Sequence, residues 1–272
     1  MKTLYISDLD GTLLDSTASV TPENADCLNR AIALGAGFSI ATARTSASVV
    51  DILRPVNCVL PVIVMNGAGI YDVKECRYLS LIQLPVQTTH DILNLLRREK
   101  LTGFCYTENN GRLDVYYDYY ANEAQRRFAE SRYDLATKRY IKGEYPGGEA
   151  IFYSVIDSEE NTARLMELLK EVSGISAHRY QDAYDREAWI IEIYRDGISK
   201  KSGVEWLRNY CNAEEVVAFG DNENDRMLFA AADRSYAVAN AVETIKKQAT
   251  AVLPDTDSAA VGRFILSDVR RR

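Results

Sequence analysis

Cysteine and histidine are scarce in this sequence. Its five cysteines are scattered, no two of them form a CxxC pair, and histidine occurs only twice in 272 residues. A disulfide framework or a cysteine-based zinc site needs closely and regularly spaced ligands. The sequence therefore argues against the disulfide-rich and zinc-binding classes and indicates reduced thiols in a cytoplasmic protein.

Long apolar runs and an excess of positive charge are also missing. No segment approaches the length of a membrane-spanning helix, and the first residues pass into a strand pattern without the apolar region of a signal peptide. The formal net charge is −7, whereas binding to a nucleic-acid backbone needs clustered Lys and Arg. We expect a cytoplasmic protein, a monomer or weak homodimer, with no membrane or nucleic-acid partner.

The sequence does contain an alternation of strand and helix patterns. Hydrophobic residues make up 47% of the chain and charged residues 26%, as in ordinary globular proteins. The expected elements include strand 3–7, helix 21–35, strand 37–42, helix 46–53, strand 58–67 and, later, strands 215–221, 235–239 and 251–253. Strands joined by helical crossovers predict an α/β fold with a doubly wound parallel sheet, which binds ligands at the carboxyl ends of its strands.

The segment from 84 to 195 interrupts this alternation. An Asn-Asn-Gly turn separates two strand patterns in it, and further strands follow around a helix, which is typical of an α+β domain with antiparallel strands. The simplest organisation is a discontinuous core with an insertion. Residues 1–83 form the first part of the core, 84–195 the inserted domain and 196–272 the second part of the core.

Two acidic clusters follow predicted strands. Asp8 and Asp10 stand two positions apart after the first strand, and Asp221 and Asp225 lie in the sequence GDNEND after the strand at 215–221. Because the ends of parallel strands meet at one edge of a sheet, we expect these carboxylates to lie close together. Oxygen is the ligand that Mg²⁺ prefers, so a shared magnesium ion would offset the repulsion between them.

Polar and basic residues stand at three further positions of this kind. Thr42 and Asn66 end the second and third predicted strands, and Lys200 begins a helix. A cation at that end of a helix is unfavourable unless an anion lies opposite, and helix N-termini bind phosphate. We therefore interpret Lys200 as a residue that faces an anion.

Four of these features form motifs that stand far apart in the chain. They are DLDGTLL at residues 8–14, Thr42 in the sequence Thr42-Ala43-Arg44, Lys200 followed by Lys201, and GDNEND at residues 220–225. With the sequence NGA at residues 66–68, the chain resembles the haloacid dehalogenase (HAD) superfamily of phosphohydrolases, in its Cof-type subgroup with a type IIB cap. Ala43 and Lys201 stand where the family commonly has glycine, and VANA at residues 238–241 replaces MGNA.

The resemblance implies a Mg²⁺-dependent phosphatase with a Rossmann-like HAD core and an inserted α+β cap that selects the substrate. Asp8 would be the nucleophile that forms an aspartyl-phosphate, and Asp10 the general acid and base. Thr42 and Lys200 would hold the transferring phosphoryl group. The implied magnesium ligands are Asp8, the Asp10 backbone carbonyl and Asp221, and the implied phosphate-binding or orienting residues are Asn66, Asn224 and Asp225.

Other functions fit the sequence less well. A phosphomutase of the same superfamily would use the same aspartate, and a metabolite-binding regulator with vestigial activity would have little reason to keep both acidic clusters. A dinucleotide-binding oxidoreductase would need a third glycine after Gly67-Ala68-Gly69, and a serine hydrolase would need a GxSxG sequence. We expect a small phosphorylated metabolite as substrate, with sugar phosphates first and nucleotides, flavin mononucleotide and pyridoxal phosphate next.

Overall fold

The computed structural model describes residues 2–130, 137–182, 185, 187–254 and 259–272. Contacts between residues divide the chain into two compact units. Unit 1 consists of Met1–Ser80 and Ser199–Arg272, and unit 2 of Leu81–Ile198. The sequence analysis places its boundaries near the same positions, and the role of the inserted segment as a cap stays a prediction.

Unit 1 is built on a five-stranded sheet, in which the strand order is β14-β13-β12-β1-β2 and neighbouring strands run parallel to each other. This sheet confirms the expected doubly wound α/β fold. Its strands are β1 (Thr3–Ser7), β2 (Gly37–Ile40), β12 (Glu215–Gly220), β13 (Arg234–Val238) and β14 (Ala251–Leu253).

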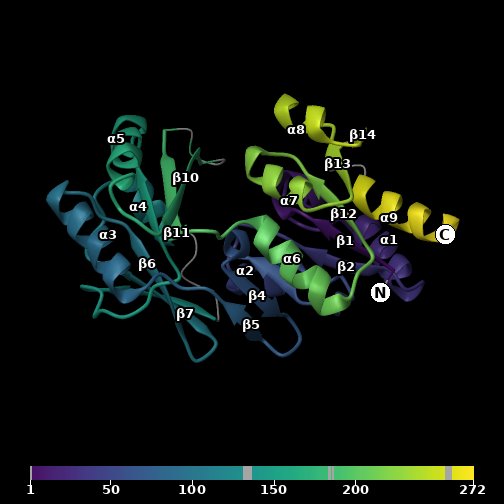
Figure 1. The fold of residues 1–272 in the computed structure, drawn as a ribbon, viewed down its shortest axis with the longest axis horizontal. Coiled ribbons are helices and arrows are strands. Elements are labelled where there is room, and N and C mark those ends of the chain that lie inside the picture. The colour runs from purple at the N-terminus through teal and green to yellow at the C-terminus, as the bar shows by residue number, and fades with distance from the viewer. Residues whose placement is uncertain (1, 131–136, 183–184, 186, 255–258) are drawn as a thin grey trace. The chain divides into compact units, whose positions relative to one another are not determined.

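Helices cover this sheet on both sides. Figure 1 shows α1 and α9 on one side of the labelled strands and α6 and α7 on the other. The helices of unit 1 are α1 (Pro22–Ala33), α2 (Ser46–Ile52), α6 (Lys200–Cys211), α7 (Arg226–Ala230), α8 (Glu243–Gln248) and α9 (Ala260–Arg271). In the described part of the chain, no helix combines the length and the apolar character that crossing a membrane requires.

The central strands explain why the acidic clusters meet. All five residues of β1 are buried, which fits a strand whose two faces are both covered by helices. Its neighbour β12 runs parallel to it, with Ser7 opposite Phe219. The residues that follow these two strands, Asp8 and Asp221, therefore leave the same edge of the sheet.

The third predicted strand is shorter than expected. The structure has β3 at Val62–Val64, and it pairs with a hairpin, β4 (Gly69–Asp72) and β5 (Arg77–Leu81), that the sequence analysis does not predict. An isolated bridge between Ala41 and Ile63 links β3 to the end of β2. The short turn η2 (Met65–Gly67) ends β3, because all three of its residues have positive φ angles that a strand does not accommodate.

Unit 2 is an α+β layer with a six-stranded sheet of order β10-β11-β9-β6-β7-β8. Its pairings are antiparallel, except that β7 and β8 run parallel. Helices α3 and α5 bury their leucines and isoleucine against one face of this sheet (Figure 1). The elements are α3 (Val86–Arg98), β6 (Phe104–Asn109), β7 (Arg112–Tyr117), α4 (Glu123–Glu130), β8 (Lys138–Lys142), β9 (Phe152–Asp157), α5 (Glu159–Leu169), β10 (Ile175–Gln181) and β11 (Trp189–Arg195).

Gly67 is held at a close approach between two parts of unit 1. Its φ angle is +103°, and a Cβ atom at this position would overlap the backbone carbonyl oxygen of Ser199, the residue before α6. Gly35 has a similar φ of +96°, but a Cβ atom there would meet nothing within 4 Å. Substitutions at the two positions therefore distinguish the energetic cost of backbone strain from the cost of steric overlap.

We expect Gly67→Ala to destabilise the protein more than Gly35→Ala. Positive φ alone costs about 1–2 kcal/mol for an L-residue, and overpacking adds about 1–3 kcal/mol at position 67. Urea unfolding of both variants measures the difference. Equal losses of unfolding free energy would contradict a tight contact between Gly67 and Ser199.

Candidate active site

Asp8 lies directly after β1 and is almost completely buried. Its side chain is 6% exposed, and its backbone N–H donates to the carbonyl of Phe219 over 2.9 Å. That bond extends the pairing of β1 with β12 by one residue. The nucleophile implied by the sequence is therefore fixed to the neighbouring strand, at the edge where Asp221 also emerges.

Lys200 is the cation that faces Asp8. It is the first residue of α6, and its Nζ donates to Oδ1 of Asp8 over 2.5 Å and to Oδ1 of Asp225 over 2.7 Å. The lysine side chain is 1% exposed. Two carboxylates explain why a cation is stable at the positive end of a helix dipole and away from water.

Asp225 orients this ion pair and the turn around it. Its carboxylate is fully buried, and Oδ2 accepts hydrogen bonds from the backbone N–H groups of Asp221 and Asn222 at 2.9 and 3.1 Å. A Cβ on Gly220 would lie 2.7 Å from the Asp225 carboxyl group, so this position requires glycine. Residues near the start of the GDNEND sequence are thus hydrogen-bonded to the side chain of its last residue.

The pKa values reflect the crowding of negative charge. Burial raises the pKa of Asp8 well above its ordinary value, against the opposing effect of Lys200 and with further upward contributions from Asp225 and Asp221. Burial and the charge of Asp225 raise the pKa of Asp221 to about 6. Burial alone would lower the pKa of Lys200, but the charges of Asp225 and Asp8 outweigh it and raise that pKa, so the lysine holds its proton.

The residues fit a divalent cation with a preference for oxygen ligands. Asp8, Asp221 and Asp225 each offer an oxygen, and the three oxygens lie within 4.8 Å of one another. The three carboxylates carry three negative charges when ionised and Lys200 supplies one positive charge, which leaves two negative charges to be neutralised. Among the described residues, no hydrogen bond is directed at Oδ2 of Asp8 or Oδ2 of Asp221, so these two oxygens remain available to Mg²⁺.

The turn η1 (Leu9–Leu13) brings backbone close to Asp221. Gly11 has a φ of +75°, and a Cβ there would overlap the Asp221 carboxylate. Thr12 Oγ1 donates to Oδ1 of Asp221 over 2.9 Å, and the Asn240 side chain donates to the Gly11 carbonyl over 2.7 Å. The glycine is therefore required for the turn, and two polar side chains keep it against the acidic cluster.

Asp10 lies outside the group of three carboxylates. Its side chain is 48% exposed and is held by Arg44, whose Nε donates to Oδ2 over 2.7 Å and whose second guanidinium nitrogen donates to Oδ1 over 2.5 Å. The two aspartates of the DLDGTLL motif thus have different surroundings. Asp8 faces a buried lysine, whereas Asp10 faces a partly exposed arginine.

The remaining predicted residues divide between buried and exposed positions. Thr42 is buried, and its Oγ1 accepts the backbone N–H of Arg44 over 3.1 Å. Asn66 is buried, and its backbone N–H donates to the Thr42 carbonyl over 3.0 Å. Asn224 is exposed in η3 (Glu223–Asp225) and forms no hydrogen bond with the described residues of the site. Roles for these residues at a phosphate stay predictions.

Sequence reasoning gives no role to three residues of the site, namely Thr12, Arg44 and Asn240. Each belongs to a motif that the sequence analysis quotes, DLDGTLL, Thr42-Ala43-Arg44 and VANA. Their presence in these motifs is therefore the sequence signal that could have identified them as site residues. Their partners lie 34 to 229 positions away in the sequence, which no local pattern reveals.

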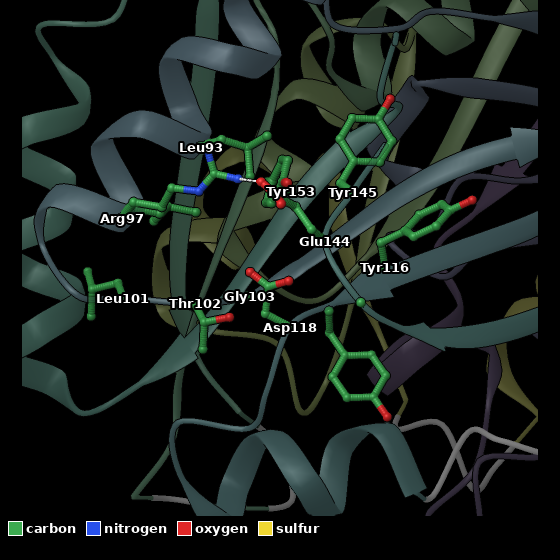
Figure 2. Close-up of a pocket in the computed structure, with 13 residues that line it drawn as sticks. Leu93, Arg97, Leu101, Thr102, Gly103, Tyr116, Asp118, Glu144, Tyr145 and Tyr153 are labelled. Carbon is green, nitrogen blue, oxygen red and sulfur yellow. Dashed lines mark hydrogen bonds and ion pairs between the residues drawn. The ribbon is translucent and has the colours of Figure 1, made fainter. Parts of the chain in front are cut away.

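Unit 2 has a separate, small cavity of about 40 Å³ (Figure 2). Its one lining arginine, Arg97, is paired with Glu144, and Asp118 and Tyr116 are also among the residues that line it. This lining is acidic and aromatic, and its one arginine is already neutralised, so it is a poor site for phosphate. The acidic cluster of unit 1 is the better candidate for the chemistry.

Comparisons with known proteins identify the family of the chain. Residues 5–265 match a family model described as haloacid dehalogenase-like hydrolase. The chain is 31% identical to phosphatase YwpJ of Bacillus subtilis, over 97% of this chain and 99% of the relative, and 24% identical to pyridoxal phosphate phosphatase YbhA of Escherichia coli, over 96% of each. Its fold is similar to that of the HAD subclass IIB sugar phosphatase BT4131, with a TM-score of 0.74, 18% identity and 98% and 99% coverage.

We expect Lys200→Met to lower the free energy of unfolding by about 3–5 kcal/mol in metal-free buffer, because it leaves two buried carboxylates without their cation. Lys201→Met is the matched control. That neighbouring lysine is 42% exposed and pairs with Glu205 one turn away, so its loss should cost about 0.5 kcal/mol or less. Urea unfolding in the presence of a chelator measures both, and similar losses would contradict the structural role of Lys200.

Proposed function

The chain belongs to the haloacid dehalogenase-like hydrolases, and from this premise we propose that it releases phosphate from small phosphomonoesters through a covalent intermediate on Asp8. The curated relatives named above are phosphatases. The observation that carries the proposal is the buried pair of Asp8 and Lys200, with Asp225 and Asp221 beside it. This arrangement combines a carboxylate nucleophile with charges that suit a phosphoryl group.

In the first step, an oxygen of Asp8 attacks phosphorus and the bond from phosphorus to the leaving oxygen breaks. Asp10, protonated, gives its proton to the leaving oxygen, so that an alcohol departs. Lys200 holds the ionised Asp8 in place and, with Thr42, offers positive charge and a hydroxyl to the phosphoryl oxygens. The products are an aspartyl-phosphate, a free alcohol and an ionised Asp10.

In the second step, water attacks the phosphorus of the aspartyl-phosphate. Asp10, now ionised, accepts a proton from that water, and the bond between phosphorus and the Asp8 oxygen breaks. Inorganic phosphate leaves, and both aspartates return to their first state. Over the two steps one water is consumed for each ester cleaved, and Asp10 serves once as acid and once as base.

Mg²⁺ is the metal that we propose for the acidic cluster. Asp8 and Asp221 would hold it through their side chains, with the Asp10 backbone carbonyl as a further ligand and Asp225 engaged mainly by Lys200 and backbone N–H groups. When bound, the ion neutralises the charge between nucleophile and phosphate, which would otherwise repel each other.

The substrate class that we propose is a small phosphorylated metabolite, with sugar phosphates as the first choice. Two proteins to which the chain is similar are named for a sugar phosphate and for pyridoxal phosphate. The inserted unit 2 would select among such leaving groups, as the resemblance to the type IIB cap group implies. Arg126 and Arg127, the adjacent arginines of α4, are paired with carboxylates of unit 2, so they do not argue for a second anion on the substrate.

We expect the purified protein with Mg²⁺ to release phosphate from para-nitrophenyl phosphate and from at least one member of a phosphometabolite panel. Asp8→Asn should abolish this turnover, because the amide is a poor nucleophile. Asp51→Asn is the control, since Asp51 of α2 is an exposed carboxylate paired with Arg54. Turnover by the Asp8 variant near the level of the control would reject Asp8 as nucleophile, and an inactive wild-type protein would reject the function.

We expect Mg²⁺ to stabilise the folded protein and Asp221→Asn to remove most of that effect. A ligand that binds only the folded state raises the free energy of unfolding by about 2.7 kcal/mol when its concentration is 100 times its Kd. Thermal unfolding with and without Mg²⁺ measures the gain independently of activity. An equal gain in the wild-type protein and in the Asp221 variant would place the ion elsewhere.

A further inference from the structure

We propose that Arg44 is a positioning residue that fixes the carboxylate of Asp10 for both of its proton transfers. The proposal rests on the function proposed above, because it concerns the residue that serves as acid and base there. Its basis is the two-point ion pair between the Arg44 guanidinium and both oxygens of Asp10, at 2.7 and 2.5 Å. Neither the family match nor the names of the relatives assigns a role to Arg44.

The ion pair determines the orientation of a side chain that would otherwise rotate. Asp10 lies in the irregular turn η1, and its carboxylate is about half exposed. Within the described ranges, Arg44 is the one side chain that forms hydrogen bonds to this carboxylate. A planar guanidinium that binds both oxygens fixes the plane of the carboxylate, which a single ammonium cannot do.

The backbone of Arg44 is itself fixed from two sides. Its N–H donates to Oγ1 of Thr42 over 3.1 Å, and its carbonyl accepts the N–H of Met65 over 2.9 Å. Asn66 makes the parallel bond to the Thr42 carbonyl, over 3.0 Å. The loop that carries Arg44 is thus attached to the turn η2 by two backbone hydrogen bonds.

Backbone strain in η2 supports this interpretation. Met65 and Asn66 have φ angles of +51° and +53°, in the left-handed region that non-glycine residues avoid. Strain of this kind costs about 1–3 kcal/mol for each residue and persists only where the surrounding structure holds the backbone in place. Here the strained residues are the ones whose N–H groups reach the carbonyls of Arg44 and Thr42.

The chemistry needs such a support because Asp10 acts twice at one place. It must first present a proton to the leaving oxygen and then accept one from the water that enters at the same side of phosphorus. A carboxylate that rotated between the two steps would lose the alignment that proton transfer requires. Arg44 would therefore act on the rate through Asp10, without a contact to the phosphoryl group.

The test compares Arg44→Ala, Asp10→Asn and the double variant, with para-nitrophenyl phosphate as the probe. We expect Arg44→Ala to lower kcat by roughly tenfold to a hundredfold, which is less than the loss expected when the general acid and base itself is removed. The variant should change KM by less than about threefold, because Arg44 does not bind the substrate in this proposal. In the Asp10→Asn background, removal of Arg44 should cause no further loss, because the arginine acts through that carboxylate.

Two further measurements separate positioning from a structural role. Added guanidinium ion should restore part of the kcat of Arg44→Ala, whereas Arg44→Lys should recover less because it cannot bind both oxygens. Arg54→Ala is the matched control, since Arg54 is an exposed arginine of the same unit, and it should keep wild-type kcat and show no response to guanidinium. Unfolding curves identify any variant that is not folded, and Arg44→Gln then replaces Arg44→Ala.

Several outcomes would overturn the proposal. Multiplicative losses in the double variant, or a large rise in KM, would mean that Arg44 binds the substrate directly. An unchanged kcat in Arg44→Ala would mean that the ion pair has no part in turnover. A crystal structure of Arg44→Ala with the Asp10 carboxylate in its original orientation would also reject the positioning role. This structural result does not depend on the phosphatase assay. A wild-type protein without phosphatase activity would instead reject the proposed function.

Discussion

Lys200 forms hydrogen-bonded ion pairs with Asp8 and with Asp225, and the rest of the site depends on these two interactions. All three side chains are removed from water, so each charge requires the others. The need to keep these three buried charges together restricts the structure around them. The lysine must begin a helix beside the sheet edge, the turn after β12 must fold back to present Asp225, and glycine must occupy the positions where side chains would separate these groups.

The site also shows how a negative cluster can be assembled without a cation for every carboxylate. Lys200 neutralises one charge, and backbone N–H groups and Thr12 stabilise the oxygens that face the protein. The remaining charge is concentrated on the oxygens of Asp8 and Asp221 that no described residue binds. The repulsion is therefore strongest between these two oxygens, and a divalent ion bound there would relieve it and allow an anionic phosphate group to approach.

Much of this can be predicted from the sequence, for a physical reason. Strands buried on both faces are largely apolar, so β1 and β12 are recognisable, and parallel strands bring their ends together, so Asp8 and Asp221 are expected to meet. In the hairpin of β4 and β5, the strand β5 escapes prediction because it is partly exposed and its pattern is weaker. The pairing of Arg44 with Asp10 escapes it because that contact depends on where two loops lie in three dimensions, which a motif does not encode.

The position of the two partners along the chain has a consequence for folding. Asp8 and Lys200 are 192 residues apart, and the whole of unit 2 lies between them in the sequence. During synthesis, the strand that precedes Asp8 is made long before its neighbour β12 and before the lysine that neutralises it. One edge of β1 can pair with β2 early, but its other edge must wait for β12 from the last third of the chain, and closure of this long loop carries the entropic cost of completing the site.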